Sequence, residues 1–326
     1  MTQETFLNLL SVIGIIFLLL STGYLCRRVG VIDDIGSKRL SGLIIKLGQP
    51  LMIVGALISK PFSTELLQTG LFFMLIGFLL HPLLLAFALL CGPLYKDENK
   101  RKISTFATIF TNCGFIGFPI LEALLPGKGA FIGAFFVIGF HVYVWTMGIA
   151  ILGRGREDIK LTPLKAIVNL GTIPCVIGLG LYFLQAVVTI PTFLVDFTNH
   201  LGNLCLPISV LVTGALVARQ GLLRLLGNAR LFLFNAIKLI GIPLAVCLIV
   251  KLITLPMSPD RAYEIVLFCT IIAALPSGAS ISMLGELYDI DPEYAAQTVG
   301  SSSLLCIGTL PLIYFIGDLI AKWTWI

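Results

Sequence analysis

The 326-residue sequence has little charge: Asp, Glu, Lys and Arg make up 12% of it, against about 25% in soluble globular proteins. Apolar residues make up 57% of the chain, and the mean hydropathy is +1.01. A chain of this composition lacks the polar surface that two or three soluble domains would need. The net charge of +5 lies in short clusters between apolar runs. Such clusters are typical of the loops of a membrane protein. Because the positive charge is not spread over a globular surface, we expect no nucleic-acid partner.

Several sites are also missing from the sequence. The eight cysteines include no CxxC pair and no Cys/His ligand spacing, which argues against a disulfide framework and a zinc site. There is no GxxxxGK[ST], HExxH or GxSxG motif and no pair of aspartates in the apolar runs. We therefore expect no enzymatic activity, no ATP-driven step and no cofactor or metal. The N-terminus lacks a basic region and a cleavage site, so the first apolar run is expected to be retained.

Long apolar runs dominate the chain, and each is close to the roughly 20 residues that a helix needs to cross a bilayer. Ten such runs predict an all-α multipass membrane protein. Their bounds are 6–26, 40–59, 66–94, 103–125, 129–152, 164–187, 192–217, 231–253, 264–288 and 294–317. The connections between them are too short for a separate soluble domain.

Lysine and arginine are unevenly divided between the loops. One set of alternate loops carries fifteen: Arg27, Arg28, Lys38, Arg39, Lys96, Lys100, Arg101, Lys102, Arg154, Arg156, Lys160, Lys165, Arg219, Arg224 and Arg230. The opposite side carries five: Lys60, Lys128, Lys251, Arg261 and Lys322. Because cytoplasmic loops are enriched in these residues, we expect both termini outside and a location in the cell (cytoplasmic or inner) membrane.

The ten runs divide into two halves of five, residues 1–158 and 159–326. An odd number of spans in each half means that the second half enters the membrane the other way up, and such inverted repeats are typical of transporters. Weak internal similarity supports the division. Leu-Gly-Gln-Pro-Leu in the second run resembles Leu-Cys-Leu-Pro-Ile in the seventh, and each is followed by Gly-Ala-Leu.

Helix-breaking residues fall in the middle of the fourth and ninth runs. The fourth contains Asn112, Gly114, Gly117 and Pro119, and the ninth contains Pro276 beside other small residues. Broken backbone at membrane depth is tolerated only where it is buried in protein or lines a cavity. The helix ends that such breaks create carry partial positive charge and N–H groups, so they predict an anion site. Simple proline kinks are the alternative interpretation.

Three stretches resemble the auxin efflux carrier family of membrane transporters in its short bacterial form. The first covers residues 23–32 and continues to Pro50. The second, residues 112–120, matches the pattern Asn-x-Gly-x-x-Gly-x-Pro. The third joins Ala-Leu-Pro-Ser-Gly at 274–278 with residues 286–292 and 309–311. Plant members have proline where this chain has Thr111 and a long loop between spans 5 and 6, so kinase control of that loop is not expected here.

The resemblance implies ten helices in two inverted five-helix repeats. Spans 4 and 9 would be broken and cross near the midplane, where a carboxylate would bind. Spans 1, 2, 6 and 7 would form a scaffold, and the remaining spans would form a unit that moves as an elevator. The resemblance also implies a homodimer through the scaffold. Bacterial relatives look like permeases for organic anions such as malonate or malate, and plant relatives export auxin.

The candidate substrate-binding residues lie at the two breaks: Thr111, Asn112, Cys113, Gly114, Pro276, Ser277 and Gly278. Asn112 and Ser277 would donate to a carboxylate, although each could instead bond within the helix bundle. Pro119 and Pro276 are the predicted helix breaks.

Four further polar side chains lie inside spans and are expected to support the site: Lys46, Gln49, His141 and Lys238. An ionisable group inside the membrane indicates function by default. Lys46 and Gln49 share a helix face and would form a polar wall that draws in an anion. The two lysines could instead extend to the membrane surface, and His141, a candidate proton carrier, could be a packing residue.

The sequence thus predicts a secondary transporter of small carboxylates that works by alternating access. Proton coupling or uniport is favoured over sodium coupling, because no cluster of Asp or Asn surrounds the breaks. The alternatives are a sodium-coupled carrier of the bile-acid-symporter type and a membrane sensor that binds an anion without moving it.

Overall fold

The computed structural model describes residues 3–91, 94–156, 159 and 168–323. Within these ranges all regular secondary structure is helical, apart from one isolated backbone bridge. Three predictions fall partly outside the described residues: Lys160 and Lys165 of a basic loop, the start of the span 164–187, and residue 158, where the predicted first repeat ends.

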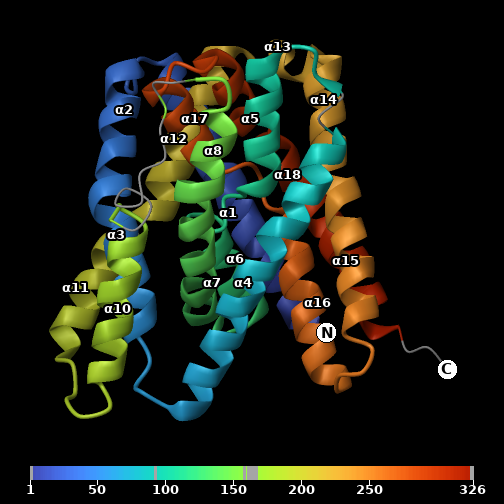
Figure 1. The fold of residues 1–326 in the computed structure, drawn as a ribbon. Coiled ribbons are helices and arrows are strands. Elements are labelled where there is room, and N and C mark those ends of the chain that lie inside the picture. Colours follow the sequence, from blue (N-terminus) through green and yellow to red (C-terminus); the bar gives the residue numbers. More distant parts are fainter. Residues whose placement is uncertain (1–2, 92–93, 157–158, 160–167, 324–326) are drawn as a thin grey trace. The chain divides into compact units, whose positions relative to one another are not determined.

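The helices follow the apolar runs of the sequence (Figure 1). In chain order they are α1 (Gln3–Arg28), α2 (Asp34–Leu43), η1 (Ile44–Gly48), α3 (Gln49–Ile58), α4 (Thr64–Cys91), α5 (Glu98–Ile109), α6 (Gly117–Leu124), α7 (Gly129–Tyr143), η3 (Val144–Gly148), α8 (Ile149–Leu152), α10 (Thr172–Leu184), α11 (Thr192–Gly202), α12 (Cys205–Gln220), α13 (Leu222–Gly227), α14 (Ala229–Ala236), η4 (Ile237–Gly241), α15 (Ile242–Ile253), α16 (Pro259–Ala274), α17 (Ser280–Leu287) and α18 (Pro292–Lys322).

Seven helical stretches in the described chain are long and apolar enough to cross a membrane. They are Glu4–Arg28, Asp34–Ile58, Thr64–Cys91, Gly129–Leu152, Thr192–Gln220, Ala229–Ile253 and Pro292–Lys322. The other three predicted runs also contain helix. Runs 103–125 and 264–288 are each interrupted, and run 164–187 contains the shorter α10. The chain is therefore a multipass all-helical protein, while the ten-span inverted repeat stays a prediction.

Three of the long helices contain a π-helical turn, at η1, η3 and η4. In η1 and η4 the cause is a proline two residues beyond the turn, Pro50 and Pro243 respectively. Proline has no N–H to donate, and its ring clashes with the carbonyl four residues back. The wider π turn relieves that clash without ending the helix.

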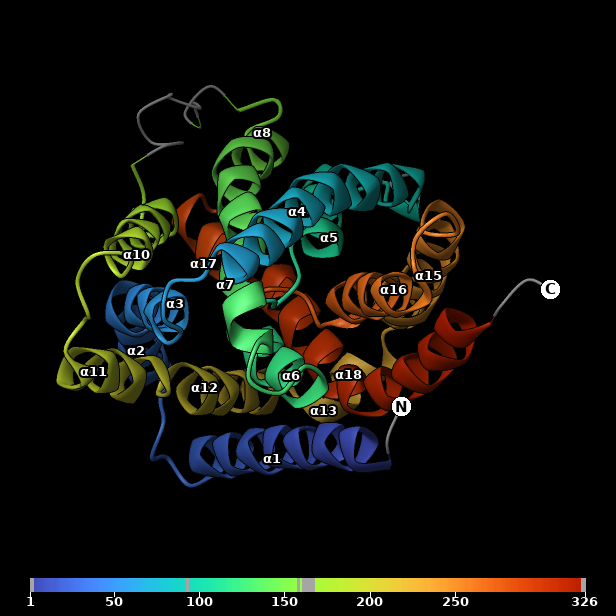
Figure 2. The same cartoon turned by 90° about the horizontal axis from the view of Figure 1, so that it is seen from below.

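The described chain packs as two compact units, each assembled from segments far apart in sequence. The first unit consists of Met1–Leu18, Leu83–Cys113 and Leu216–Ile326, and the second of Leu19–Pro82 and Gly114–Ala215. Within the first unit α16 packs against α15 and α18 (Figure 2). Within the second, α3 packs against α10 and α11, and α6 against α7.

Glycines let two helices of the second unit approach closely. A methyl group on Gly214 of α12 would overlap the carbonyl oxygen of Leu20 in α1. We expect Gly214→Ala to destabilise the protein by about 1–3 kcal/mol, as overpacking does elsewhere, and to lower its melting temperature in detergent. Gly180→Ala in α10 is the matched control, because its new methyl group would meet no atom within 4 Å. Equal melting temperatures for the two variants would contradict this account of the contact.

Candidate functional site

Two helix breaks meet in the first unit. α5 ends at Ile109 and α16 ends at Ala274, and each is followed by extended backbone at Phe110 and Leu275. The breaks therefore lie in the fourth and ninth runs, as the sequence predicts. Pro276 lies inside the second break.

The two extended segments pair through their backbones. Thr111 and Ser277 form an isolated antiparallel bridge. The Asn112 N–H donates to the carbonyl oxygen of Pro276 at 2.8 Å, and the Gly278 N–H donates to that of Phe110 at 2.9 Å. These two amides are therefore committed to each other's segment. The expectation that the breaks offer free N–H groups is wrong for Asn112 and Gly278, because the buried backbone satisfies itself first.

The carbonyl end of α16 receives its hydrogen bonds from side chains. The Lys238 ammonium donates to the carbonyl oxygens of Ala273 at 2.9 Å and Leu275 at 3.0 Å. The Cys306 thiol donates to that of Ala274 at 3.6 Å. With the bond from Asn112 to Pro276, four consecutive carbonyls of the break have donors. A cation at the negative end of a helix is also electrostatically favourable.

Lys238 and Lys46 have different environments, although the sequence treats them alike. Lys238 is only 1% exposed, and its ammonium is bonded to the two α16 carbonyls. Lys46, in η1 of the second unit, is exposed. The structure therefore places Lys238, but not Lys46, at the breaks of the first unit.

Polar side chains remain available where the two extended segments after α5 and α16 pair, a place that we call the crossover. Asn112 is 5% exposed, and its amide makes no hydrogen bond within the described residues. The Ser277 hydroxyl is fully buried and also lacks a partner there. α17 follows with Ala279 at its N-cap, which provides no side-chain cap. Two unpartnered polar side chains beside an uncapped helix start could bind an anion.

A run of serines in α18 supports the crossover and was not identified from the sequence. The Ser302 hydroxyl accepts the Ser277 N–H at 3.1 Å. The neighbouring Ser301 hydroxyl accepts from Asn235 Nδ2 at 2.9 Å. Two features of the sequence could have indicated this contact. Three consecutive serines lie within an apolar run, and Asn235 lies three residues before Lys238.

The remaining predicted residues lie in the second unit, except for Cys113, which is buried in the first. Gln49 Nε2 lies 3.4 Å from Nε2 of the buried His141, so these two predicted residues do meet. Gly114 is half-buried.

Pro119 was predicted to break the fourth span, and this is wrong in detail. The break precedes Pro119, which is the third residue of α6. A proline is tolerated in the first helical turn, because the N–H it lacks would have no helical acceptor there.

The second unit contains a largely apolar cavity of about 450 Å³. Met52, Phe115 and Phe118 supply apolar surface, and the amides of Asn199 and Asn203 are among its polar groups. Small-molecule sites are commonly apolar cavities with a few polar groups. The cavity is therefore suited to an amphipathic ligand.

Comparison with known families agrees with this architecture. A family model described as "membrane transport protein" matches residues 9–314, nearly the whole chain. Comparison with curated proteins finds no match. The matched family is one of membrane transporters rather than of enzymes. The chain therefore belongs to the auxin efflux carrier family of membrane transporters.

Proposed function

We propose that this chain is a secondary transporter of small organic anions, carboxylates such as malonate, malate or an auxin-like acid. The substrate binds at the crossover of the first unit, between the breaks that follow α5 and α16. Two inverted five-helix repeats give it alternating access to the two sides of the cytoplasmic membrane, with both chain termini outside. Alternating access takes the elevator form, in which one group of helices moves against a fixed scaffold.

The observation that carries the proposal is the pair of unpartnered polar side chains at the crossover. A carboxylate has two acceptor oxygens, and the Asn112 amide and the Ser277 hydroxyl are both donors. The surrounding backbone of the first unit is shaped by Thr111, Cys113, Pro276 and Gly278. Lys238 acts indirectly, because its ammonium holds the carbonyls of Ala273 and Leu275 and offsets their partial negative charge.

Coupling to protons, or uniport, is preferred to coupling to sodium. The buried His141 lies within hydrogen-bonding range of Gln49 in the second unit, with Nε2 of each side chain 3.4 Å apart. Protonation of His141 would turn its acceptor nitrogen into a donor and change this contact. Such a group is suited to coupling a proton to a conformational change.

Uptake by reconstituted protein tests the proposal. Proteoliposomes are given labelled malate or malonate, with and without a pH gradient and with and without sodium. We expect saturable uptake that does not depend on sodium, and stimulation by the pH gradient if protons are coupled. Uptake that requires sodium would favour the bile-acid-symporter type of carrier. Binding of either acid without uptake would contradict transport and favour a sensor.

A further inference from the structure

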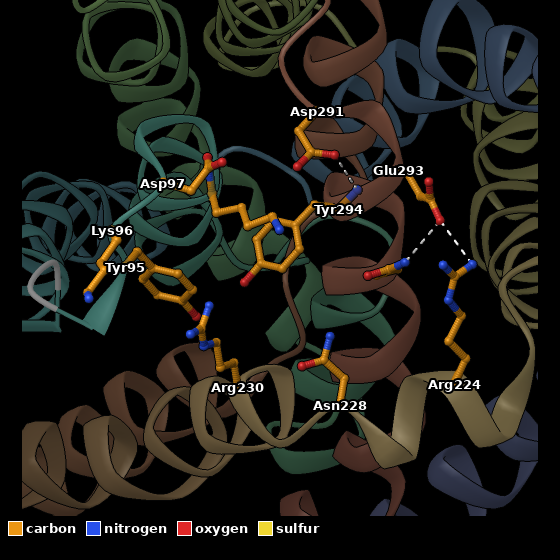
Figure 3. Close-up of a pocket in the computed structure, with 11 residues that line it drawn as sticks. Tyr95, Lys96, Asp97, Arg224, Asn228, Arg230, Asp291, Glu293 and Tyr294 are labelled. Atoms are coloured by element: carbon orange, nitrogen blue, oxygen red, sulfur yellow. Dashed lines mark hydrogen bonds and ion pairs between the residues drawn. The ribbon is translucent and has the colours of Figure 1, made fainter.

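A second polar cavity lies in the first unit, separate from the crossover segments. It has a volume of about 390 Å³, within the range of small-molecule sites. The α4–α5 connection, the start of α14 and the start of α18 contribute its walls (Figure 3). These segments lie in loops that the distribution of Lys and Arg predicts to be cytoplasmic.

Two of the carboxylates in this cavity are committed to capping helices. Asp97 accepts the Lys100 N–H at 2.9 Å at the start of α5. Asp291 accepts the Tyr294 N–H at 3.1 Å at the start of α18. Their negative charge is therefore directed at helix N-termini.

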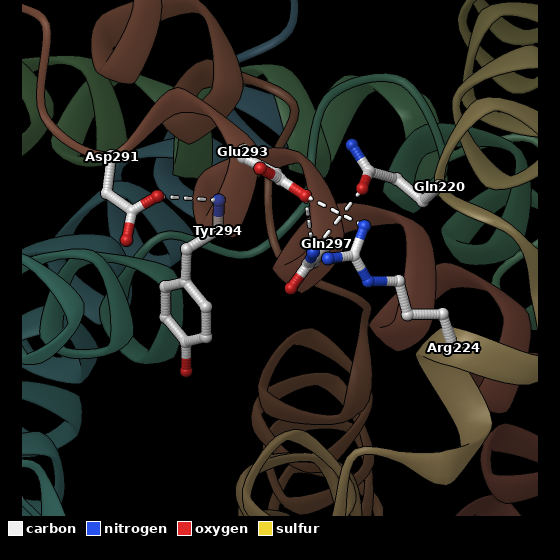
Figure 4. A network of polar contacts seen from close by, with 6 residues as sticks. All are labelled: Gln220, Arg224, Asp291, Glu293, Tyr294 and Gln297. Carbon is white, nitrogen blue, oxygen red and sulfur yellow. Dashed lines mark hydrogen bonds and ion pairs between the residues drawn. The ribbon is translucent and has the colours of Figure 1, made fainter.

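The third carboxylate belongs to a surface network (Figure 4). Glu293 lies 3.2 Å from the Arg224 guanidinium and accepts from Gln297 Nε2 at 3.3 Å. Gln297 Nε2 also lies 3.4 Å from the side-chain oxygen of Gln220. Glu293 therefore offsets the charge of Arg224.

Three cations of the cavity remain without a carboxylate partner in the described part of the chain: Lys96, Lys100 and Arg230. The Lys100 ammonium lies 5.6 Å from the centre of the Tyr294 ring. Arg230 and Tyr95 point toward one another (Figure 3). With the three carboxylates engaged elsewhere, these cations leave the cavity positively charged.

A neutral donor, Tyr95, and the start of α14 add to the attraction for an anion. Burial and the neighbouring Tyr294 raise the pKa of the Tyr95 phenol, which therefore keeps its proton and can donate a hydrogen bond. α14 also begins at the cavity, where its N-cap Asn228 accepts the Leu231 N–H at 3.2 Å. A helix start carries partial positive charge. The carboxylates of Asp97 and Asp291 offset that charge at α5 and α18, whereas the neutral cap of α14 leaves its start able to favour an anion.

We propose that this cavity binds a phosphate group, either of a soluble phosphate compound or of an anionic lipid headgroup, at a site distinct from the transport site. A phosphate monoester carries about 1.5–2 negative charges and three acceptor oxygens at neutral pH. One guanidinium and two ammonium groups match this better than they match a single carboxylate. Bound phosphate would connect the starts of α5, α14 and α18 and so stabilise the first unit.

The test measures the melting temperature of the purified full-length protein with inorganic phosphate, and with sodium chloride at equal ionic strength. A second arm compares nanodiscs that contain phosphatidic acid, a lipid with a phosphate monoester, with nanodiscs of phosphatidylcholine. We expect phosphate or phosphatidic acid to raise the melting temperature, and Arg230→Gln and Lys100→Gln each to weaken binding by about tenfold or more. Arg39→Gln is the matched control, since Arg39 is an exposed arginine outside the cavity.

The arms separate the two sources of phosphate. A saturable response to free phosphate identifies a soluble ligand, and a response to phosphatidic acid alone identifies a lipid. An equal response in Arg230→Gln and Arg39→Gln, or an equal effect of chloride, would overturn the site. A malonate response lost in Arg230→Gln would place the cavity on the substrate path and overturn the phosphate assignment. None of these readings requires transport.

Discussion

Lys238→Met is expected to unfold or strongly destabilise the protein and to abolish uptake. The variant keeps the length of the side chain but removes the ammonium that bonds the carbonyls of Ala273 and Leu275. Each buried carbonyl left without a donor costs about 1–3 kcal/mol. Because both carbonyls belong to the break after α16, the loss also frees the backbone that positions Ser277. The melting temperature in detergent and the uptake rate are the two measurements.

Lys46→Met is the matched control for this experiment. Lys46 also lies in a π-helical turn, but its side chain is exposed and does not bond the carbonyls of a helix break. We expect its melting temperature to stay near that of the unmodified protein. If Lys238→Met had the same melting temperature as Lys46→Met, the ammonium of Lys238 would not be the group that stabilises the end of α16.

Asn112→Ala is expected to reduce uptake of the carboxylate by about tenfold to a hundredfold while leaving the fold intact. The amide donates no hydrogen bond within the described protein, so its removal leaves no protein group unpaired. A hydrogen bond to a charged substrate is worth about 1.5–3 kcal/mol, which sets the expected loss. The backbone bond from Asn112 to Pro276 does not involve the side chain and is retained.

Asn99→Ala provides the comparison, since Asn99 is an exposed residue of the same helix, α5. The decisive reading combines uptake with melting temperature. Normal uptake by Asn112→Ala would remove the crossover from the substrate site. Loss of uptake together with a lower melting temperature would mean that Asn112 has a structural role instead.

The helices and their breaks are predictable from the sequence because they depend on local composition. A long apolar run predicts a membrane helix, and Pro276 predicts an interruption near its own position. The position of Pro119 was less informative, because proline is compatible with the first turn of a helix as well as with a break.

The hydrogen-bonding partners at the breaks depend on tertiary packing, which the sequence does not reveal. Lys46 and Lys238 both precede a glycine and a proline, yet only Lys238 is buried. Serines in an apolar helix usually bond to their own backbone, as Ser302 does to Val299 at 3.1 Å. That local bond conceals the second role of Ser302, as acceptor for the Ser277 N–H.

The π turn η4 also constrains how related sequences can be aligned with this one. A π turn contains one residue more than an α turn, so it rotates all later side chains by about 100° around the helix axis. Deleting one residue between Lys238 and Ile242 would leave Lys238 in place but turn Val246 and Cys247, now buried, away from their present positions. A relative with an uninterrupted helix here therefore requires a one-residue gap between its lysine and its α15. An ungapped alignment would compare core positions of one protein with lipid-facing positions of the other.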